Sequence, residues 1–243
     1  PNTRCNTMEF WKNKVAIVTG AGQGIGAEIT EDLVRNGMTV IGFEPTEDSV
    51  YKMMKKVATW GKVDGQLVPC KCDVSNDEDL KFAFEGIVAT YGGVDVLINN
   101  AAIGKAGLIS TGDISDMKNV IDVNIYGLIA CTRFAIESMT KKDTLGQIIN
   151  INSICGHYMP PFAEPKINMY IASKRAMTIL NTLLKNEFNG HENTLCLLIV
   201  IRNPKRVRLV STYIQFLLKL KSQSRCKCFY LALKTGKLRS HKM

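Results

Sequence analysis

Short apolar, β-branched runs alternate with longer amphipathic stretches from Lys14 to about Ile201. Runs of the first kind are typical of buried strands, and stretches with apolar residues every three or four positions are typical of helices. The predicted strands span residues 14–20, 38–43, 66–72, 94–100, 146–153 and 194–201. The predicted helices span residues 24–37, 46–61, 75–92, 116–141 and 169 to about 189. This alternation predicts an α/β fold, a doubly wound parallel sheet with helices on both faces.

The net charge of +9 is unevenly divided along the chain. Residues 191–243 hold twelve Lys or Arg and one acid, a net charge of +11 that leaves −2 for residues 1–190. Beyond Arg202 the apolar patches show no sustained period. We therefore expect one domain over residues 1–202, followed by an atypical and poorly ordered basic tail over 203–243. A basic amphipathic helix that contacts a membrane or nucleic acid is the alternative for this tail.

Composition narrows the class of protein. A chain of 243 residues with 46% hydrophobic and 22% charged residues is typical of one globular domain. No run approaches the ~20 apolar residues of a membrane span, and the first ten residues lack a secretory h-region. Eight cysteines are present without the C-x(2–4)-C pairs of structural zinc sites, so we expect reduced thiols, a cytoplasmic location and no metal. Because residues 1–190 carry a net charge of only −2, and so no basic patch, we expect no nucleic-acid partner.

A glycine-rich loop, TGAGQGIG, joins the first predicted strand to the first predicted helix. Gly20, Gly24 and Gly26 allow a sharp turn and a close backbone approach, and the helix N-terminus offers free N–H groups to an anion. Turns also collect glycine for purely geometric reasons. The position at the first strand-to-helix turn favours a dinucleotide pyrophosphate site, and with it a Rossmann-type fold.

Further polar residues lie at the carboxyl ends of predicted strands, where open α/β sheets bind ligands. Glu44, 24 residues after Gly20, takes the place of the acid that binds the adenosine ribose, although it could be a solvated loop acid in EPTED. A carboxylate repels a 2′-phosphate and accepts hydrogen bonds from a free 2′-hydroxyl, so Glu44 predicts a preference for NAD(H). Asp73 and Val74 follow the third strand, and Asn100 ends the fourth.

Candidate catalytic residues occur in the second half of the predicted domain. Tyr170 and Lys174 are spaced i, i+4 at a helix start and share one face. An adjacent ammonium favours the phenolate of a tyrosine whose ordinary pKa is ~10, although such pairs also occur on plain surfaces. Ser153 ends a strand, and Asn124 is a polar residue on an apolar helix face that needs a partner or a purpose.

Six motifs, in this order, resemble those of the short-chain dehydrogenase/reductase family: TGAGQGIG, CDVS, NNAA, the asparagine of DVN, the serine of INS, and YIASK. The resemblance covers residues 10 to about 190. The segments MEFWKNKVAIVTGAGQGIG, CDVSNDEDL and INSICGH are most similar to the insect farnesol dehydrogenase branch and its vertebrate relative, dehydrogenase/reductase family member 11. The resemblance implies an NAD(P)-dependent oxidoreductase that interconverts a small alcohol and a carbonyl, and a homo-oligomer. Because the branch is generally NADP-linked, NADP(H) stays open beside NAD(H).

The resemblance also implies a role for each matching position. Tyr170 would be the general acid/base, and Lys174 would lower its pKa and bind the nicotinamide ribose. Ser153 would hold the substrate oxygen, and Asn124 would anchor a water of the proton relay. The implied cofactor contacts are Gly20, Gly24, Ile25 and Gly26 at the pyrophosphate, Asp73 and Val74 at the adenine, and Asn100 near its ribose.

Three features depart from the family pattern. Ala102 replaces the usual glycine of NNAG, and the stretch GHYMPPFAEPKIN is longer than most members show. After IVI the chain continues as RNPKRVRLVST, without the Pro-Gly turn that contacts the nicotinamide in the family. We therefore expect a truncated or atypical C-terminal part. A catalytically impaired or inactive chain that still binds dinucleotide is the alternative function.

Overall fold

The computed structural model describes residues 9–142, 146–157, 165–187, 194–201, 230–234 and 237–241. Its strands are β1 Val15–Thr19, β2 Thr39–Glu44, β3 Gln66–Lys71, β4 Val96–Asn99, β5 Gly146–Ser153, β6 Thr194–Ile201, β7 Tyr230–Lys234 and β8 Lys237–His241. Its longer helices are α1 Gly24–Arg35, α2 Glu47–Val57, α3 Asp77–Tyr91, α4 Ile114–Ile121, α5 Leu128–Lys142 and α6 Asn168–Glu187. Short helical turns are η1 Glu9–Trp11, η2 Asp122–Gly127, η3 Ile154–Gly156 and η4 Pro165–Ile167.

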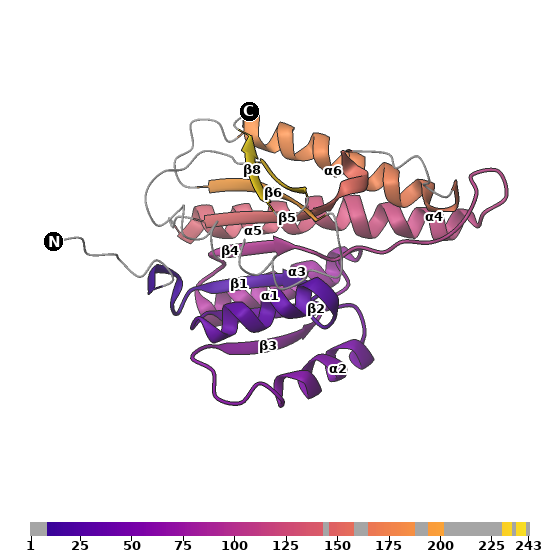
Figure 1. Cartoon of the computed structure of the whole chain (residues 1–243). Coiled ribbons are helices and arrows are strands. Elements are labelled where there is room, and N and C mark those ends of the chain that lie inside the picture. Colours follow the sequence, from indigo (N-terminus) through magenta and orange to yellow (C-terminus); the bar gives the residue numbers. More distant parts are fainter. Residues whose placement is uncertain are drawn as a thin grey trace.

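The strands form one sheet in the order β3-β2-β1-β4-β5-β6-β7-β8 (Figure 1). The pairs from β3 across to β7 are parallel, and β8 runs antiparallel to β7. The strand order reverses between β1 and β4, which is the switch point where open α/β sheets bind ligands. The structure confirms the predicted Rossmann-type α/β fold.

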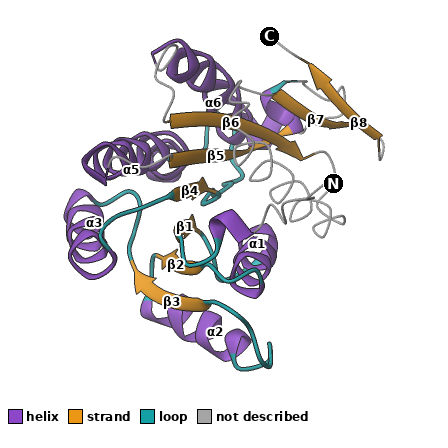
Figure 2. Cartoon of the chain, turned by 90° about the vertical axis from the view of Figure 1, so that its left-hand side faces the viewer, coloured by secondary structure: helices purple, strands orange, loops and turns teal. Residues whose placement is uncertain are grey.

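Helices cover both faces of the sheet, with α1 on one side and α3 and α5 on the other (Figure 2). One buried cluster joins Ile29 and Leu33 of α1 to the strands and to Met53 of α2. The other joins Leu80 of α3 and Cys131 of α5 to the opposite strand face. Burial of both strand faces explains why β1 and β4 are continuous apolar runs in the sequence.

The predicted helix over 116–141 is helical throughout Ile114–Lys142. It consists of α4, the π-helical turn η2 and α5, which follow one another without a break. Among the described residues, this helix is long and apolar enough to cross a membrane by length and composition, with a mean hydropathy of 1.2. Nevertheless, 44% of its apolar window is buried inside the fold, as in a helix packed on a sheet.

Two of the strands lie in the basic segment 203–243. The strand β7 pairs with β6 and continues the parallel sheet, an extension that the sequence pattern did not predict. The remaining residues of 203–243 lie outside the described part, so the poor order expected for this tail stays a prediction.

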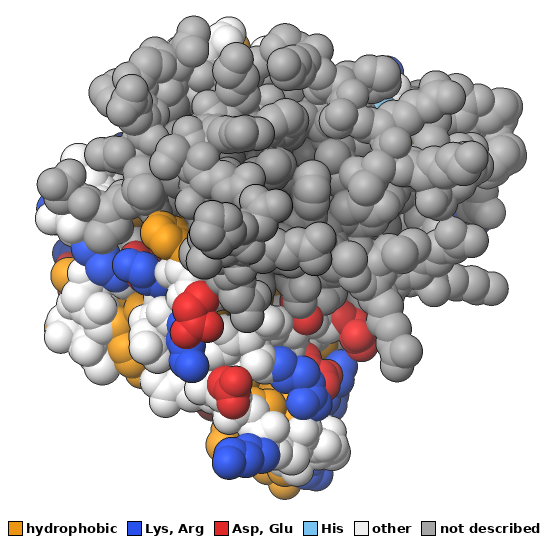
Figure 3. Space-filling model, turned by 60° about the vertical axis from the view of Figure 1, so that its left-hand side comes forward, with side chains coloured by type: hydrophobic (Ala, Val, Ile, Leu, Met, Phe, Trp, Pro, Cys, Tyr) orange, Lys and Arg blue, Asp and Glu red, His pale blue; other side chains and the backbone are white. Residues whose placement is uncertain are grey.

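The described surface carries charges of both signs. On the face in Figure 3, Lys and Arg side chains lie next to Asp and Glu side chains. Several exposed pairs are spaced i, i+4 on helices, including Arg35 with Glu31 and Lys52 with Asp48. This mixture agrees with the near-neutral charge of residues 1–190.

Candidate active site

The glycine-rich turn brings β1, α1 and the end of β4 into close contact. Gly20 and Gly24 have φ angles of +65° and +54°, in the left-handed region that favours glycine. A Cβ on Gly26 would lie 2.0 Å from the Gly20 carbonyl oxygen, so no side chain fits there. Gln23 takes the N-cap position of α1 without a side-chain capping bond, which leaves the first-turn N–H groups open to an anion. The turn therefore fits a pyrophosphate.

Hydrogen bonds of Thr19, at the end of β1, and Asn100, directly after β4, stabilise this turn. The Thr19 hydroxyl accepts hydrogen bonds from the backbone N–H groups of Asn100 and Ala101, at 3.0 and 2.9 Å. The Asn100 amide donates to the carbonyl oxygens of Thr19 and Gly20, both at 3.0 Å. Sequence reasoning missed Thr19. The signal was available, because a polar residue that ends a buried apolar strand needs a partner.

Glu44, at the end of β2, reaches into the glycine-rich loop. Its carboxylate accepts a hydrogen bond from the Gly22 backbone N–H at 2.6 Å, and only 6% of the residue is exposed. It is thus a buried part of the site rather than a solvated loop acid.

A cleft of about 560 Å³ opens at the carboxyl ends of β1, β2, β3 and β4. This volume is within the range of small-molecule and cofactor sites. Six of the predicted cofactor residues line it: Gly20, Ile25, Glu44, Asp73, Val74 and Asn100. The cleft, the uncapped helix start and the glycine turn together fit a dinucleotide.

The loop after β3 is held by its own side chains. The Asp73 carboxylate accepts hydrogen bonds from the Ser75 backbone N–H at 2.9 Å and from the Ser75 hydroxyl at 2.6 Å. Asp73 therefore shapes the loop, while Val74 forms the apolar wall of the cleft.

The predicted catalytic residues Ser153, Tyr170 and Lys174 lie near one another but do not line this cleft. Ser153, at the end of β5, and Tyr170, in the first turn of α6, lie close enough for the Ser153 hydroxyl to lower the pKa of the phenol. The Lys174 ammonium lies 5.8 Å from the centre of the Tyr170 ring and donates to the Ile151 carbonyl oxygen at 3.2 Å. Gly104 packs over the Tyr170 ring, where a Cβ would meet the ring carbon Cδ2 at 3.6 Å. The loop after β4 thus runs from the cleft to Tyr170.

The pKa of Tyr170 is shifted by burial and by two neighbouring side chains. Burial raises the pKa of this phenol, the Ser153 hydrogen bond opposes the rise, and the Cys155 thiol adds to it. Burial also lowers the pKa of Lys174 to about 8. Lys174 is not among these causes, so its expected lowering of the tyrosine pKa stays a prediction.

Asn124 lies in the π-helical turn η2 and is 1% exposed. Its side-chain oxygen accepts from the Ile103 backbone N–H at 2.8 Å. Its amide nitrogen donates to the Ile103 carbonyl oxygen at 2.9 Å and to the Ser173 hydroxyl at 3.0 Å. Both amide hydrogens are thus engaged by the protein. The local sequence carries no signal for these partners, which are 21 and 49 residues away.

The other departures from the family pattern have different outcomes. Among the described residues, Asn13 is the only non-glycine residue with a positive φ, so Ala102 fits an ordinary backbone conformation. Most of the long stretch that follows Gly156 lies outside the described residues.

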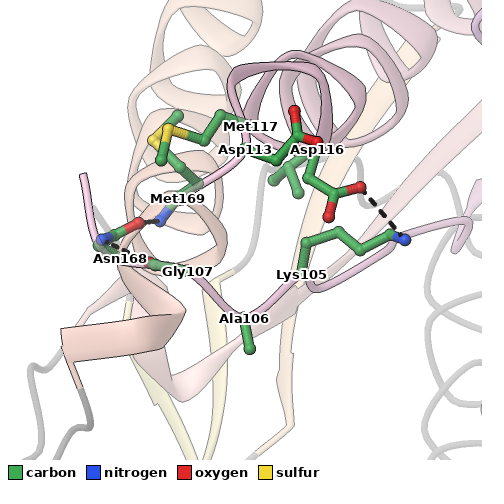
Figure 4. Close-up of a pocket in the computed structure, with 9 residues that line it drawn as sticks. Lys105, Ala106, Gly107, Asp113, Asp116, Met117, Asn168 and Met169 are labelled. Carbon is green, nitrogen blue, oxygen red and sulfur yellow. Dashed lines mark hydrogen bonds and ion pairs between the residues drawn. The ribbon is translucent and has the colours of Figure 1, made fainter. Parts of the chain in front are cut away.

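A second, smaller hollow lies beside the start of α6 (Figure 4). Its volume of about 10 Å³ is close to the minimum for one water molecule. Lys105 forms an ion pair with Asp116 at 3.3 Å, and the Asn168 amide donates to the Gly107 carbonyl oxygen at 3.0 Å. The Asn168 contact holds the loop after β4 against α6, the helix that carries Tyr170, and the ion pair holds the same loop against α4.

The comparisons with known proteins agree with this geometry. The family model for short chain dehydrogenase matches residues 14–200. The chain is 40% identical over 184 residues to farnesol dehydrogenase from Aedes aegypti, which covers 75% of this chain and 74% of the relative. It is 39% identical over 181 residues to dehydrogenase/reductase SDR family member 11 from Bos taurus, which covers 74% and 70%. A metagenomic short-chain oxidoreductase solved in complex with NADP superimposes with a TM-score of 0.77 and 25% identity, covering 92% of this chain and 98% of that one.

Proposed function

The chain belongs to the short-chain dehydrogenase family, and we propose that it interconverts an alcohol and a carbonyl by hydride transfer with a nicotinamide dinucleotide. The proposal rests on the loop that connects the cleft to the candidate catalytic residues. Ile103 lines the cleft that fits a dinucleotide, and the next residue of the same loop, Gly104, lies against the Tyr170 ring. Ser153 and Lys174 lie beside this tyrosine.

Each part of the cleft would hold a different part of the dinucleotide. The turn from Gly20 to Gly26 would hold the pyrophosphate on the uncapped start of α1. Glu44 would bind the adenosine ribose, and Val74 would cover the adenine. When bound, the nicotinamide supplies or accepts the hydride.

Tyr170 would move the proton that accompanies the hydride. A phenol with a raised pKa keeps its proton at neutral pH, so Tyr170 suits donation to a carbonyl oxygen. The Ser153 hydroxyl, at the end of β5, would hold that oxygen within reach of the phenol. The Lys174 ammonium would bind the nicotinamide ribose, and the Asn124 turn would support the proton relay.

We propose NAD(H) as the preferred form, because the buried Glu44 carboxylate would repel a 2′-phosphate. One structural relative was solved with NADP, so the two forms must be compared directly. Equal or tighter binding of NADPH than NADH in parallel fluorescence titrations would refute this preference.

We propose a long apolar alcohol such as farnesol as substrate, which rests on the name of the mosquito relative. The test is a change in absorbance at 340 nm with farnesol and NAD⁺, and with farnesal and NADH. Ethanol and acetaldehyde serve as matched short-chain controls. Turnover of the short compounds at the same kcat/KM would remove the argument for an apolar substrate.

A second candidate is a chain that binds dinucleotide but turns over little or no substrate. The match to the family model ends at residue 200 of 243, where the family's Pro-Gly turn would follow. A nicotinamide held loosely there would lose rate, since misplaced reactants cost orders of magnitude. Saturable binding without turnover, rescued when the residues after Ile201 are replaced by those of an active relative, would favour this candidate.

A further inference from the structure

The π-helical turn η2 lies between the proposed adenine site and the helix of the catalytic tyrosine. On one side, Val123 of this turn and Val74 of the loop after β3 line the same cleft. On the other side, Asn124 of the turn is hydrogen-bonded to Ser173 of α6. One six-residue segment therefore touches both halves of the site.

The contact with the adenine side is tight and has two parts. A Cβ on Gly127 would lie 2.8 Å from Val74 Cγ2 and 2.9 Å from the Val74 carbonyl oxygen, so the turn presses directly on this loop. One residue earlier, the Tyr126 hydroxyl donates a hydrogen bond to the carboxylate of Asp77, in the first turn of α3. The turn is therefore in contact with both the loop after β3 and the first turn of α3.

The contact with the catalytic side is also direct. Asn124 holds both the N–H and the carbonyl of Ile103, which lies in the loop that reaches Tyr170. Its amide also donates to Ser173, whose hydroxyl donates to the Tyr170 carbonyl oxygen at 2.8 Å. Ser173 is fully buried, so water does not compete for these hydrogen bonds.

We infer that η2 is a positioning device that couples the adenine wall at Val74 to the placement of Tyr170, and that Tyr126 and Gly127 are its positioning residues. The inference rests on the proposed function, because it takes the cleft beside Val74 as the adenine site. A π-helical turn suits this role, since such turns are rare, break the regular helical ladder, and occur frequently at functional sites.

Hydrogen exchange in the free protein tests the link without any ligand. The variant Tyr126→Phe removes one hydroxyl, and Tyr51→Phe, at an exposed position on α2, is the matched control. Loss of the hydrogen bond from Tyr126 to Asp77 should speed amide exchange in residues 168–176 of α6 about twofold to tenfold. The control should leave that exchange unchanged. Equal exchange in Tyr126→Phe and wild type would overturn the coupling.

Gly127→Ala is the second variant, because its Cβ must displace Val74. Gly86→Ala on α3 is its control, since a Cβ there meets nothing within 4 Å. We expect faster exchange in residues 168–176 for the first variant alone. If Gly127→Ala fails to fold, the tyrosine pair still decides the question.

ADP-ribose tests transmission through the turn, since it carries the adenine and the pyrophosphate but no nicotinamide. In the wild type, binding of ADP-ribose should slow exchange in residues 168–176, and in Tyr126→Phe this slowing should fall at least twofold at equal saturation. The same slowing in both proteins would overturn the inference. If ADP-ribose does not bind the wild type, the proposed function fails, and the comparison of the free proteins alone decides on the coupling.

Discussion

The carboxylate of Glu44 and the backbone N–H of Gly22 are joined by a 2.6 Å hydrogen bond across the mouth of the cofactor cleft. The bond ties the end of β2 to the loop between β1 and α1. It also places one negative charge, 6% exposed, in the wall of a cleft that fits a dinucleotide. Because so little water reaches this carboxylate, its charge is weakly screened, and it can discriminate between ligands that differ by a phosphate.

Replacement of Glu44 should change the choice of dinucleotide. Glu44→Gln keeps the shape and the acceptor for Gly22 but removes the charge, so we expect the affinity ratio of NADPH to NADH to rise about tenfold. Parallel fluorescence titrations measure this ratio. The control is Asp48→Asn, on the exposed face of α2, which should leave the ratio as it is. An unchanged ratio in Glu44→Gln would show that this carboxylate does not discriminate between a free and a phosphorylated adenosine ribose.

Substitutions of Tyr170 and Lys174 should have different effects on turnover and on NADH binding. Tyr170→Phe should lower kcat by at least about 100-fold and keep NADH affinity within about threefold, because the hydroxyl acts on the substrate. Lys174→Ala should lower kcat and weaken NADH binding together. The control Tyr51→Phe should behave as wild type in both assays. Turnover by Tyr170→Phe at the parent rate would dispose of the catalytic assignment.

Burial of Lys174 should make stability depend on pH. Its folded pKa of about 8 is below the ordinary value of 10.5, so the unfolded chain binds more protons between these values. In this window the Lys174 contribution makes the free energy of unfolding rise with pH, and below pH 8 the buried charge costs about 3 kcal/mol. From pH 7.5 to 9.5, wild type should gain about 2 kcal/mol relative to Lys174→Met.

Urea denaturation of both proteins at these two pH values measures this gain. The comparison of the two proteins is needed because burial raises the pKa of Cys72 and Cys131, and these thiols lower stability as the pH rises above their ordinary value of 9.0. Parallel pH curves for the two proteins would mean that Lys174 is not desolvated as the structure shows.

The ion pair between Asp95 and Lys142 should stabilise the amino end of the central strand β4, opposite the site. Asp95 is fully buried, and its carboxylate accepts from Lys142 at 2.9 Å and from the Val15 backbone N–H at 2.8 Å. Lys142→Met leaves the buried carboxylate with Lys14, at 3.9 Å, as its remaining ion-pair partner, and should lower the free energy of unfolding by about 2–3 kcal/mol. Lys52→Met breaks an exposed pair and should cost no more than about 0.5 kcal/mol. Equal costs in urea denaturation would contradict this account.

The sequence was sufficient for features that depend on local pattern. The apolar runs of β1 and β4 and the glycine turn from Gly20 to Gly26 were predicted, because burial and backbone geometry impose them residue by residue. The helix predicted over 75–92 begins at Asp77 in the structure. Asn76 rather than Ser75 caps the helix, since the Ser75 hydroxyl is already bonded to Asp73.

Features that depend on distant partners were not predictable in this way. The apolar pattern of the long helix does not show that η2 is a π-helical turn, and the partners of Asn124 come from the loop after β4 and from α6. The net rise in the pKa of Tyr170 was not predictable either, because it depends on how far the fold buries the phenol. The i, i+4 spacing shows that Lys174 is near Tyr170, but it does not show how much of the phenol is exposed to solvent.

The central claim, that the cleft of this chain binds a nicotinamide dinucleotide, is tested most directly by titration of the purified protein with NADH, followed by nucleotide fluorescence. The wild type and the control Gly86→Ala should show one saturable binding event. Gly26→Ala should lose this binding while the circular dichroism spectrum stays helical, because its Cβ would fall 2.0 Å from the Gly20 carbonyl oxygen. Saturation by the wild type with loss in Gly26→Ala is the predicted result. No saturable signal from folded wild type with either NADH or NADPH would contradict the account.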